Sequence, residues 1–136
     1  VLIEQFRIGA LDNPAGAWVR EVVGGIVEGD ETPESVARRE AVEEAGCEVL
    51  DMVPICELMV SPGYSTERIY LFCGRVDASV AGGVHGIDHE GEDIRVEVVD
   101  AERAIASIYG EKVTSTSTVL SLQWLALNRE RLLRQW

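Results

Sequence analysis

The sequence predicts an α+β fold that occupies residues 1–136 as a single domain. Strand-like and helix-like segments follow one another without the regular alternation of a parallel βαβ sheet, which favours the α+β class. A chain of 136 residues is long enough for one domain with a buried core. Hydrophobic residues make up 46% of the chain and charged residues 26%, as is typical of a globular protein in water.

Several segments are expected to form strands, because they are rich in apolar and β-branched residues or alternate in polarity. They are residues 1–8, 17–23, 49–60, 68–76 and 94–99. A turn is predicted at residues 12–16, where Asp, Asn, Pro and Gly occur together. The glycine-rich residues 81–91 end in acidic side chains and are expected to form a loop, with His85 and His89 as loop residues instead of metal ligands.

Two helices are predicted clearly, and a shorter one is expected over residues 101–109. The first begins after Thr32 and Pro33, because Thr is a good N-cap and Pro suits the first helical position. Gly46 suits its end. The second covers residues 115–135, which repeat leucine and other apolar residues at helical spacing.

The composition excludes several function classes. With 24 Asp and Glu against 12 Lys and Arg, the net charge is −12, and no basic stripe is present for binding nucleic acid. No apolar run approaches the roughly 20 residues of a membrane span, and no signal peptide is visible. The three cysteines lack metal-ligand spacing, so we expect reduced, buried thiols in a cytoplasmic protein.

The predicted first helix carries a cluster of carboxylates. At about 100° per residue, Glu40, Glu43 and Glu44 fall within one arc of its surface, where they repel one another unless cations are present. Hard oxygen ligands at this density suit Mg²⁺ or Mn²⁺, which also bind phosphate. Arg39 can pair with Glu43 four residues later, and Gly24 with Gly25 is expected to allow a tight turn that brings a carbonyl to the same ions. The opposite side is expected to face the core through Ala37, Ala41, Val42 and Ala45. The alternative is an acidic face that only contacts solvent.

The spacing of these residues resembles the Nudix box. Every fixed position of that motif is matched. Five residues separate Gly25 from Glu31, and seven separate Glu31 from Arg39. The remaining fixed positions are Glu40, Glu43, Glu44 and Gly46. The resemblance implies an α-β-α sandwich with a mixed β-sheet, and hydrolysis of a nucleoside diphosphate linked to another group. It also implies that Glu40 and Glu44 bind metal together with the Gly24 carbonyl, that Glu43 is a ligand or an orienting group, and that Arg39 supports catalysis.

Three further stretches resemble the bacterial ADP-ribose pyrophosphatases of this family. Pro62 lies sixteen residues beyond Gly46, Arg7 ends a strand-like Leu-Ile-Glu-Gln-Phe-Arg segment, and residues 86–94 are similar to an acidic catalytic loop. The resemblance implies that Arg7, Pro62 and Gly25 belong to the substrate-binding set. It further implies that Glu90 is the general base, that Glu92 is an additional metal ligand, and that Mg²⁺, replaceable by Mn²⁺, is the cofactor.

The implied reaction converts ADP-ribose to AMP and ribose 5-phosphate. The chain has no initiator Met and opens inside a strand-like segment, so we expect the native protein to begin upstream, with the family's N-terminal β-rich segment that forms a homodimer. The alternatives are a pyrophosphatase for GDP-mannose or UDP-glucose, a non-catalytic nucleotide sensor and, more weakly, an enzyme that cleanses the nucleotide pool. Binding of nucleic acid or membrane is not expected.

Overall fold

A computed structural model of the chain describes residues 1–86, 93–110 and 115–136. Its strands are β1 (Leu2–Phe6), β2 (Trp18–Glu21), β3 (Val49–Met59), β4 (Arg68–Val76), β5 (Gly83–His85) and β6 (Ile94–Glu97). Its helices are α1 (Pro33–Ala45), α2 (Ala101–Ala106) and α3 (Thr116–Gln135), with short 3₁₀ turns η1 (Ile8–Ala10) and η3 (Ser107–Tyr109). The α+β class is therefore confirmed, and the strand predicted at residues 68–76 has those bounds.

The strands form a four-stranded sheet in the order β2-β1-β6-β5 and a separate β3–β4 hairpin. All the pairs given for the described residues are antiparallel, whereas the family resemblance implies a mixed sheet. The short connections between consecutive strands are part of the reason for the antiparallel pairing. The connections over residues 60–67 and 86–93 are shorter than the crossover of about a dozen residues that a parallel pair needs.

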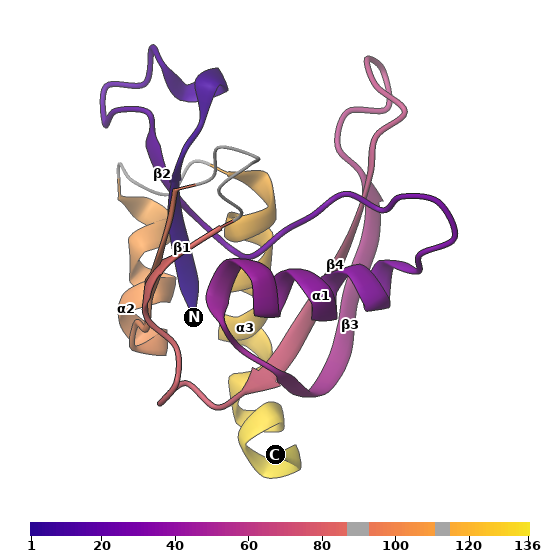
Figure 1. Cartoon of the computed structure of the whole chain (residues 1–136), viewed down its shortest axis with the longest axis vertical. Coiled ribbons are helices and arrows are strands. Elements are labelled where there is room, and N and C mark those ends of the chain that lie inside the picture. Colours follow the sequence, from indigo (N-terminus) through magenta and orange to yellow (C-terminus); the bar gives the residue numbers. More distant parts are fainter. Residues whose placement is uncertain (87–92, 111–114) are drawn as a thin grey trace.

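The four-stranded sheet has a hydrophobic cluster on each face, because successive side chains of β1 point in opposite directions. Ile3 packs on one side with Ala45, Cys47, Ile94 and Val96, at the C-terminal end of α1. Leu2 packs on the other side with Ala104 of α2 and Leu122 of α3. Figure 1 shows α1 on one side of these strands, α2 on the opposite side and the hairpin projecting on the far side of α1. The sheet thus has helices on both faces, as an α-β-α sandwich requires.

Helix α1 begins and ends where the sequence predicts. The side chain of Thr32 accepts a hydrogen bond from the Ser35 backbone N–H, and the Ser35 hydroxyl accepts one from the Thr32 N–H, which forms a capping box. Pro33 occupies the first turn, and Gly46 closes the helix in the left-handed conformation, with φ 64°. These caps fix which residues of the carboxylate motif lie within the helix.

Several expectations need correction. Residues 83–85 form β5 within the predicted loop because they pair with β6, and a three-residue strand that begins with glycine shows too little alternation to be recognised from the sequence. The predicted strand 1–8 ends at Phe6, and the predicted helix 101–109 divides into α2 and η3. Val42 is 50% exposed and does not face the core. Among the cysteines only Cys47 is buried, while Cys56 is exposed; all are free thiols.

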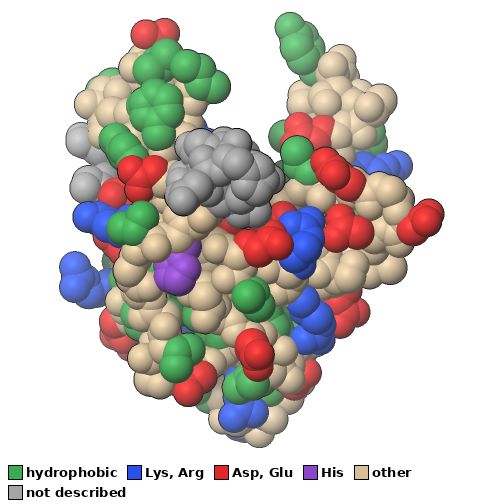
Figure 2. Space-filling model, viewed as in Figure 1, with side chains coloured by type: hydrophobic (Ala, Val, Ile, Leu, Met, Phe, Trp, Pro, Cys, Tyr) green, Lys and Arg blue, Asp and Glu red, His purple; other side chains and the backbone are tan. Residues whose placement is uncertain are grey.

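A cavity of about 1370 Å³ lies between the hairpin, α1 and α3. Its lining runs from Arg7, Gly24 and Glu40 to apolar residues of α3 such as Leu122 and Leu125. Figure 2 shows the molecule hollowed between two projecting parts, which are the β1–β2 connection and the tip of the β3–β4 hairpin in the orientation of Figure 1. None of the helices described in this structure is long and apolar enough to cross a membrane.

Candidate active site

The deepest carboxylate on α1 belongs to Glu44, which is only 3% exposed. Its Oε2 accepts a hydrogen bond from the Gly24 backbone N–H at 3.0 Å, across twenty residues of sequence. A buried carboxylate is costly unless hydrogen bonds or charges compensate it, and this bond supplies part of that compensation. The contact holds the segment after β2 against α1, so that the backbone at Gly24 lies beside the carboxylates.

At Gly25 a side chain would displace Glu40, and no turn demands a glycine. A Cβ built on Gly25 would coincide with the carboxylate of Glu40, whereas a Cβ on Gly24 would meet nothing within 4 Å. Neither glycine has the positive φ that a left-handed turn would demand, which corrects the expectation of a tight turn. The absent side chain of Gly25 lets the Glu40 carboxylate lie directly against the backbone.

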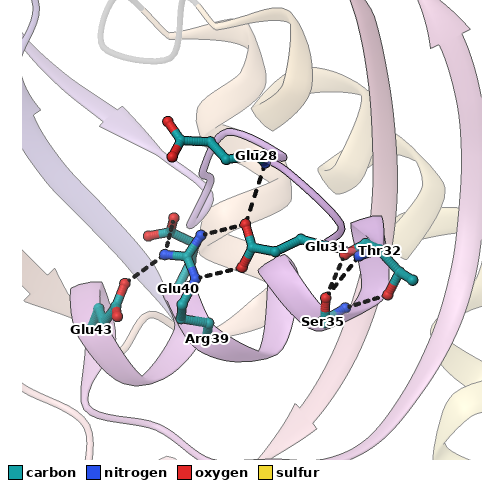
Figure 3. A network of polar contacts seen from close by, with 7 residues as sticks. All are labelled: Glu28, Glu31, Thr32, Ser35, Arg39, Glu40 and Glu43. Carbon is teal, nitrogen blue, oxygen red and sulfur yellow. Dashed lines mark hydrogen bonds and ion pairs between the residues drawn. The ribbon is translucent and has the colours of Figure 1, made fainter.

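Arg39 joins the carboxylates of the motif into one network (Figure 3). Its guanidinium lies 2.7 Å from Glu43, which is the predicted i, i+4 pair, and also 2.8 Å from Glu40 and 3.0 Å from Glu31. The hydrogen bond to Glu31, followed by the one to Glu43, raises the pKa of Arg39. The same contact with Arg39, helped by the Glu28 N–H, lowers the pKa of Glu31.

Of the three carboxylates that the helical spacing places on one arc, Arg39 holds Glu40 and Glu43, and Glu44 points elsewhere. Glu43 points to Arg39 at a partly exposed position, whereas Glu44 turns inward to the Gly24 N–H. The repulsion expected between them is therefore relieved in part by Arg39. Figure 3 shows Glu40, Glu43 and Glu31 grouped around the guanidinium, with Glu31 reaching it from the segment that precedes α1.

The donors at this position suit a hard divalent cation. Within residues 1–86, 93–110 and 115–136, no group of three Asp, Glu, His or Cys side chains converges as a complete metal cage. Mg²⁺ does not need one, because it usually keeps several waters and binds one or two carboxylates together with substrate phosphates. Glu40 and Glu44 flank the Gly24–Gly25 backbone and provide that smaller set of oxygens.

The other predicted site residues differ in where they lie. Arg7 forms an ion pair with Glu21 at 2.6 Å, and both residues line the cavity with Gly24, Gly25 and Glu40. Pro62 lies in the exposed connection between β3 and β4 and is not a lining residue of that cavity. Glu90 and Glu92 fall outside the described residues, although the strands that flank them, β5 and β6, both contact α1.

Comparison with known proteins shows the family of the chain. The NUDIX domain model matches residues 1–116, a span that includes α1, the Gly24–Gly25 backbone and the Arg39 network. The chain belongs to the NUDIX domain family. A solved NUDIX hydrolase from Listeria monocytogenes superimposes with a TM-score of 0.58 over 96% of this chain and 84% of that one. At 18% sequence identity, the structural likeness concerns the fold alone.

Among curated NUDIX relatives, the ADP-ribose pyrophosphatase of Escherichia coli K12 is 44% identical over the whole of this chain, which spans 65% of the relative. That of Haemophilus influenzae is 42% identical, again over the whole chain and 64% of the relative. A GDP-mannose pyrophosphatase from Citrobacter koseri is 37% identical over 92% of this chain. The chain therefore spans slightly less than two thirds of the length of the first two relatives.

Sequence reasoning missed two residues at this NUDIX site. Glu21 pairs with Arg7, and the strand register explains how: Ile3 lies opposite Glu21, so that Ile3, Arg7 and Glu21 share the face of the hairpin that is turned toward α1. His85, expected in a loop, lies in β5 against the C-terminal cap of α1. Both positions depend on strand register, which local patterns do not reveal.

Proposed function

We propose that the protein is a Mg²⁺-dependent hydrolase that cleaves the pyrophosphate bond of ADP-ribose, producing AMP and ribose 5-phosphate. The similarity that supports this substrate is 44% identity, over the whole chain, to a relative with the name ADP-ribose pyrophosphatase. The chemistry is supported by the site itself, where Glu40 and Glu44 flank the Gly24–Gly25 backbone and Arg7 lines the same cavity.

In this proposal Glu40, Glu44 and the Gly24 carbonyl hold the metal, and Mn²⁺ can replace Mg²⁺. Bound there, the ion would lower the pKa of water and offset charge on the phosphates. Arg39 holds Glu43 and Glu40 in place, which gives Glu43 an orienting role. The buried bond between Gly24 and Glu44 keeps the ligand set assembled before metal arrives.

Glu90 is proposed as the general base and Glu92 as a further metal ligand, on the resemblance of residues 86–94 to an acidic catalytic loop. The carboxylates of α1 already have partners, so a separate carboxylate is useful for accepting a proton from the attacking water. As that water attacks phosphorus, the bridging P–O bond breaks and the two monophosphates separate.

Arg7, Gly25 and Pro62 are proposed as substrate-binding residues. Arg7 is half exposed at the cavity rim, so its guanidinium can reach a phosphate oxygen while Glu21 fixes its direction. Gly25 is included on the family resemblance, and its missing side chain leaves the Glu40 carboxylate against the backbone at the cavity wall. In a protein with a net charge of −12, binding of an anionic substrate relies on Arg7 and on the metal.

We also infer that the full-length protein is a cytoplasmic homodimer that binds neither nucleic acid nor membrane. The acidic composition argues against nucleic-acid binding and the free thiols suit the cytoplasm, whereas the homodimer rests on the resemblance to the ADP-ribose pyrophosphatases. Size-exclusion chromatography with light scattering on the full-length protein tests the dimer. A monomer at micromolar concentration would contradict it.

The nearest alternative substrate is GDP-mannose, because a GDP-mannose pyrophosphatase is 37% identical over 92% of the chain. The deciding experiment measures kcat/KM of the full-length protein for ADP-ribose, GDP-mannose and UDP-glucose, with the products identified. We expect ADP-ribose to have the highest value. Faster turnover of GDP-mannose would replace the proposed substrate, and tight binding without turnover would indicate a nucleotide sensor.

A further inference from the structure

His85 lies against the end of the carboxylate helix. A Cβ built on Gly46, the C-cap of α1, would lie 2.8 Å from Cε1 of the His85 ring and 3.5 Å from each ring nitrogen. The ring thus occupies the side of Gly46 where any other residue would carry a side chain. Gly46 therefore satisfies two requirements, a φ of 64° and room for the imidazole.

Two further contacts hold the His85 ring and backbone in place. Nε2 lies 2.7 Å from the Gly82 carbonyl oxygen, and because a carbonyl can only accept, Nε2 donates the proton of this hydrogen bond. In the sheet, His85 pairs with Ile94 of β6. Ile94 is completely buried in the cluster that contains Ala45 and Cys47, the two neighbours of Gly46.

These contacts converge on the base of the β5–β6 connection. His85 is the last paired residue of β5 and Ile94 is the first paired residue of β6. Both are packed against the C-terminal end of α1. Glu44 lies two residues before Gly46 on that same helix. The place where the chain leaves β5 and returns to β6 is thereby fixed relative to the Glu44 carboxylate.

We propose that His85 is a positioning residue, which fastens the strands on either side of Glu90 and Glu92 to the cap of the helix that carries Glu40 and Glu44. The proposal rests on the proposed function for its catalytic consequence. A general base must lie within hydrogen-bond reach of the water it activates, and a displacement of about 1 Å can cost roughly 10²-fold in rate. His85 itself does not touch the reacting atoms.

The test compares His85→Ala with His85→Gln, which can still donate to the Gly82 carbonyl, and with Val84→Ala as a matched control. Val84 is the preceding residue of β5 and is 69% exposed. We expect His85→Ala to lower kcat by about 10- to 100-fold with KM for ADP-ribose little changed. His85→Gln should recover part of that loss, and Val84→Ala should leave kcat unchanged.

Amide hydrogen exchange in β5 and β6 provides a readout that does not depend on turnover. Faster exchange in His85→Ala than in Val84→Ala is expected, because the former loses the contacts to Gly46 and Gly82. Unchanged exchange in His85→Ala would overturn the proposal, and so would faster exchange with a normal kcat. An equal loss of kcat in His85→Gln would also overturn it. If the unmodified protein hydrolyses no nucleotide sugar, the proposed function fails, and the exchange data still decide whether His85 fastens these strands.

Discussion

The backbone N–H of Gly24 donates a hydrogen bond to Oε2 of Glu44 at 3.0 Å, which ties the segment after β2 to a buried carboxylate of α1. Strands β4, β5 and β6 also contact the carboxylate helix, but this bond brings the Gly24 backbone directly to a proposed metal ligand. The Gly24 carbonyl and the Glu44 carboxylate therefore lie close to each other.

Glu44→Gln should nearly abolish hydrolysis while the fold persists. The amide keeps the size of the carboxylate and can still accept from the Gly24 N–H, but it loses the charge that binds metal. We expect turnover to fall by roughly 10²–10³-fold, the usual effect of losing one group that stabilises the transition state. Glu34→Gln is the control, since Glu34 lies in the exposed first turn of α1. A wild-type rate for Glu44→Gln in saturating Mg²⁺ would refute the metal assignment.

Gly25→Ala should impair activity much more than Gly24→Ala. A methyl group at position 25 would collide with the Glu40 carboxylate, whereas one at position 24 meets nothing within 4 Å and leaves the carbonyl in place. We expect about a 10-fold or greater loss of kcat for Gly25→Ala and a nearly normal rate for Gly24→Ala. Steady-state kinetics at saturating Mg²⁺ measure both. Equal effects would show that the contact with Glu40 is unimportant.

Divalent metal should be required for activity and should stabilise the fold. An ion that binds only the native state stabilises it by mass action, by about 2.7 kcal/mol at a concentration 100 times Kd. The ion also relieves the repulsion between Glu40 and Glu44. Thermal melts in EDTA and in Mg²⁺ measure the stability, and parallel assays measure the rate. Identical melting curves combined with activity in EDTA would contradict the metal site.

Glu90→Gln should lower turnover by roughly 10²–10⁴-fold with little loss of substrate affinity, as expected for a general base. Glu92→Gln should instead weaken metal binding and recover at high Mg²⁺. Both variants are compared across a Mg²⁺ titration in the full-length protein. If high Mg²⁺ restores Glu90→Gln but not Glu92→Gln, the two roles are reversed. If neither variant has an effect, Glu43 becomes the candidate base.

Arg39→Gln should destabilise the protein in a pH-dependent way. Arg39 lowers the pKa of Glu31 below its ordinary value of 4.5, so the stability from this pair is present above pH 4.5 and is lost as the pH falls through the lowered pKa. The difference in Tm between the unmodified protein and Arg39→Gln should therefore be larger at pH 7 than at pH 3. Arg134→Gln is the control, because its pair with Glu130 is exposed and 3.8 Å long. A difference that is constant with pH would exclude this pair as the cause.

Local patterns in the sequence determined the elements whose signals lie within a few residues. The caps of α1 at Thr32 and Gly46 and the Arg39–Glu43 pair follow from short-range hydrogen bonding and helical spacing, and the structure confirms them. The grouping of carboxylates on α1 follows in the same way, because residues three and four apart share a helical face.

Only the tertiary structure decided which of those carboxylates is buried and what lies beside it. Glu44 is enclosed and Glu43 is not, because the Gly24 segment and the core below Ala45 cover one side of the arc. The pairing of Arg7 with Glu21 depends on strand register, and the packing of His85 on Gly46 depends on the contact between β5 and a distant helix. These contacts form because whole apolar faces of the sheet and helices become buried. The free energy of that burial comes from residues far apart in the sequence, so it leaves no local pattern.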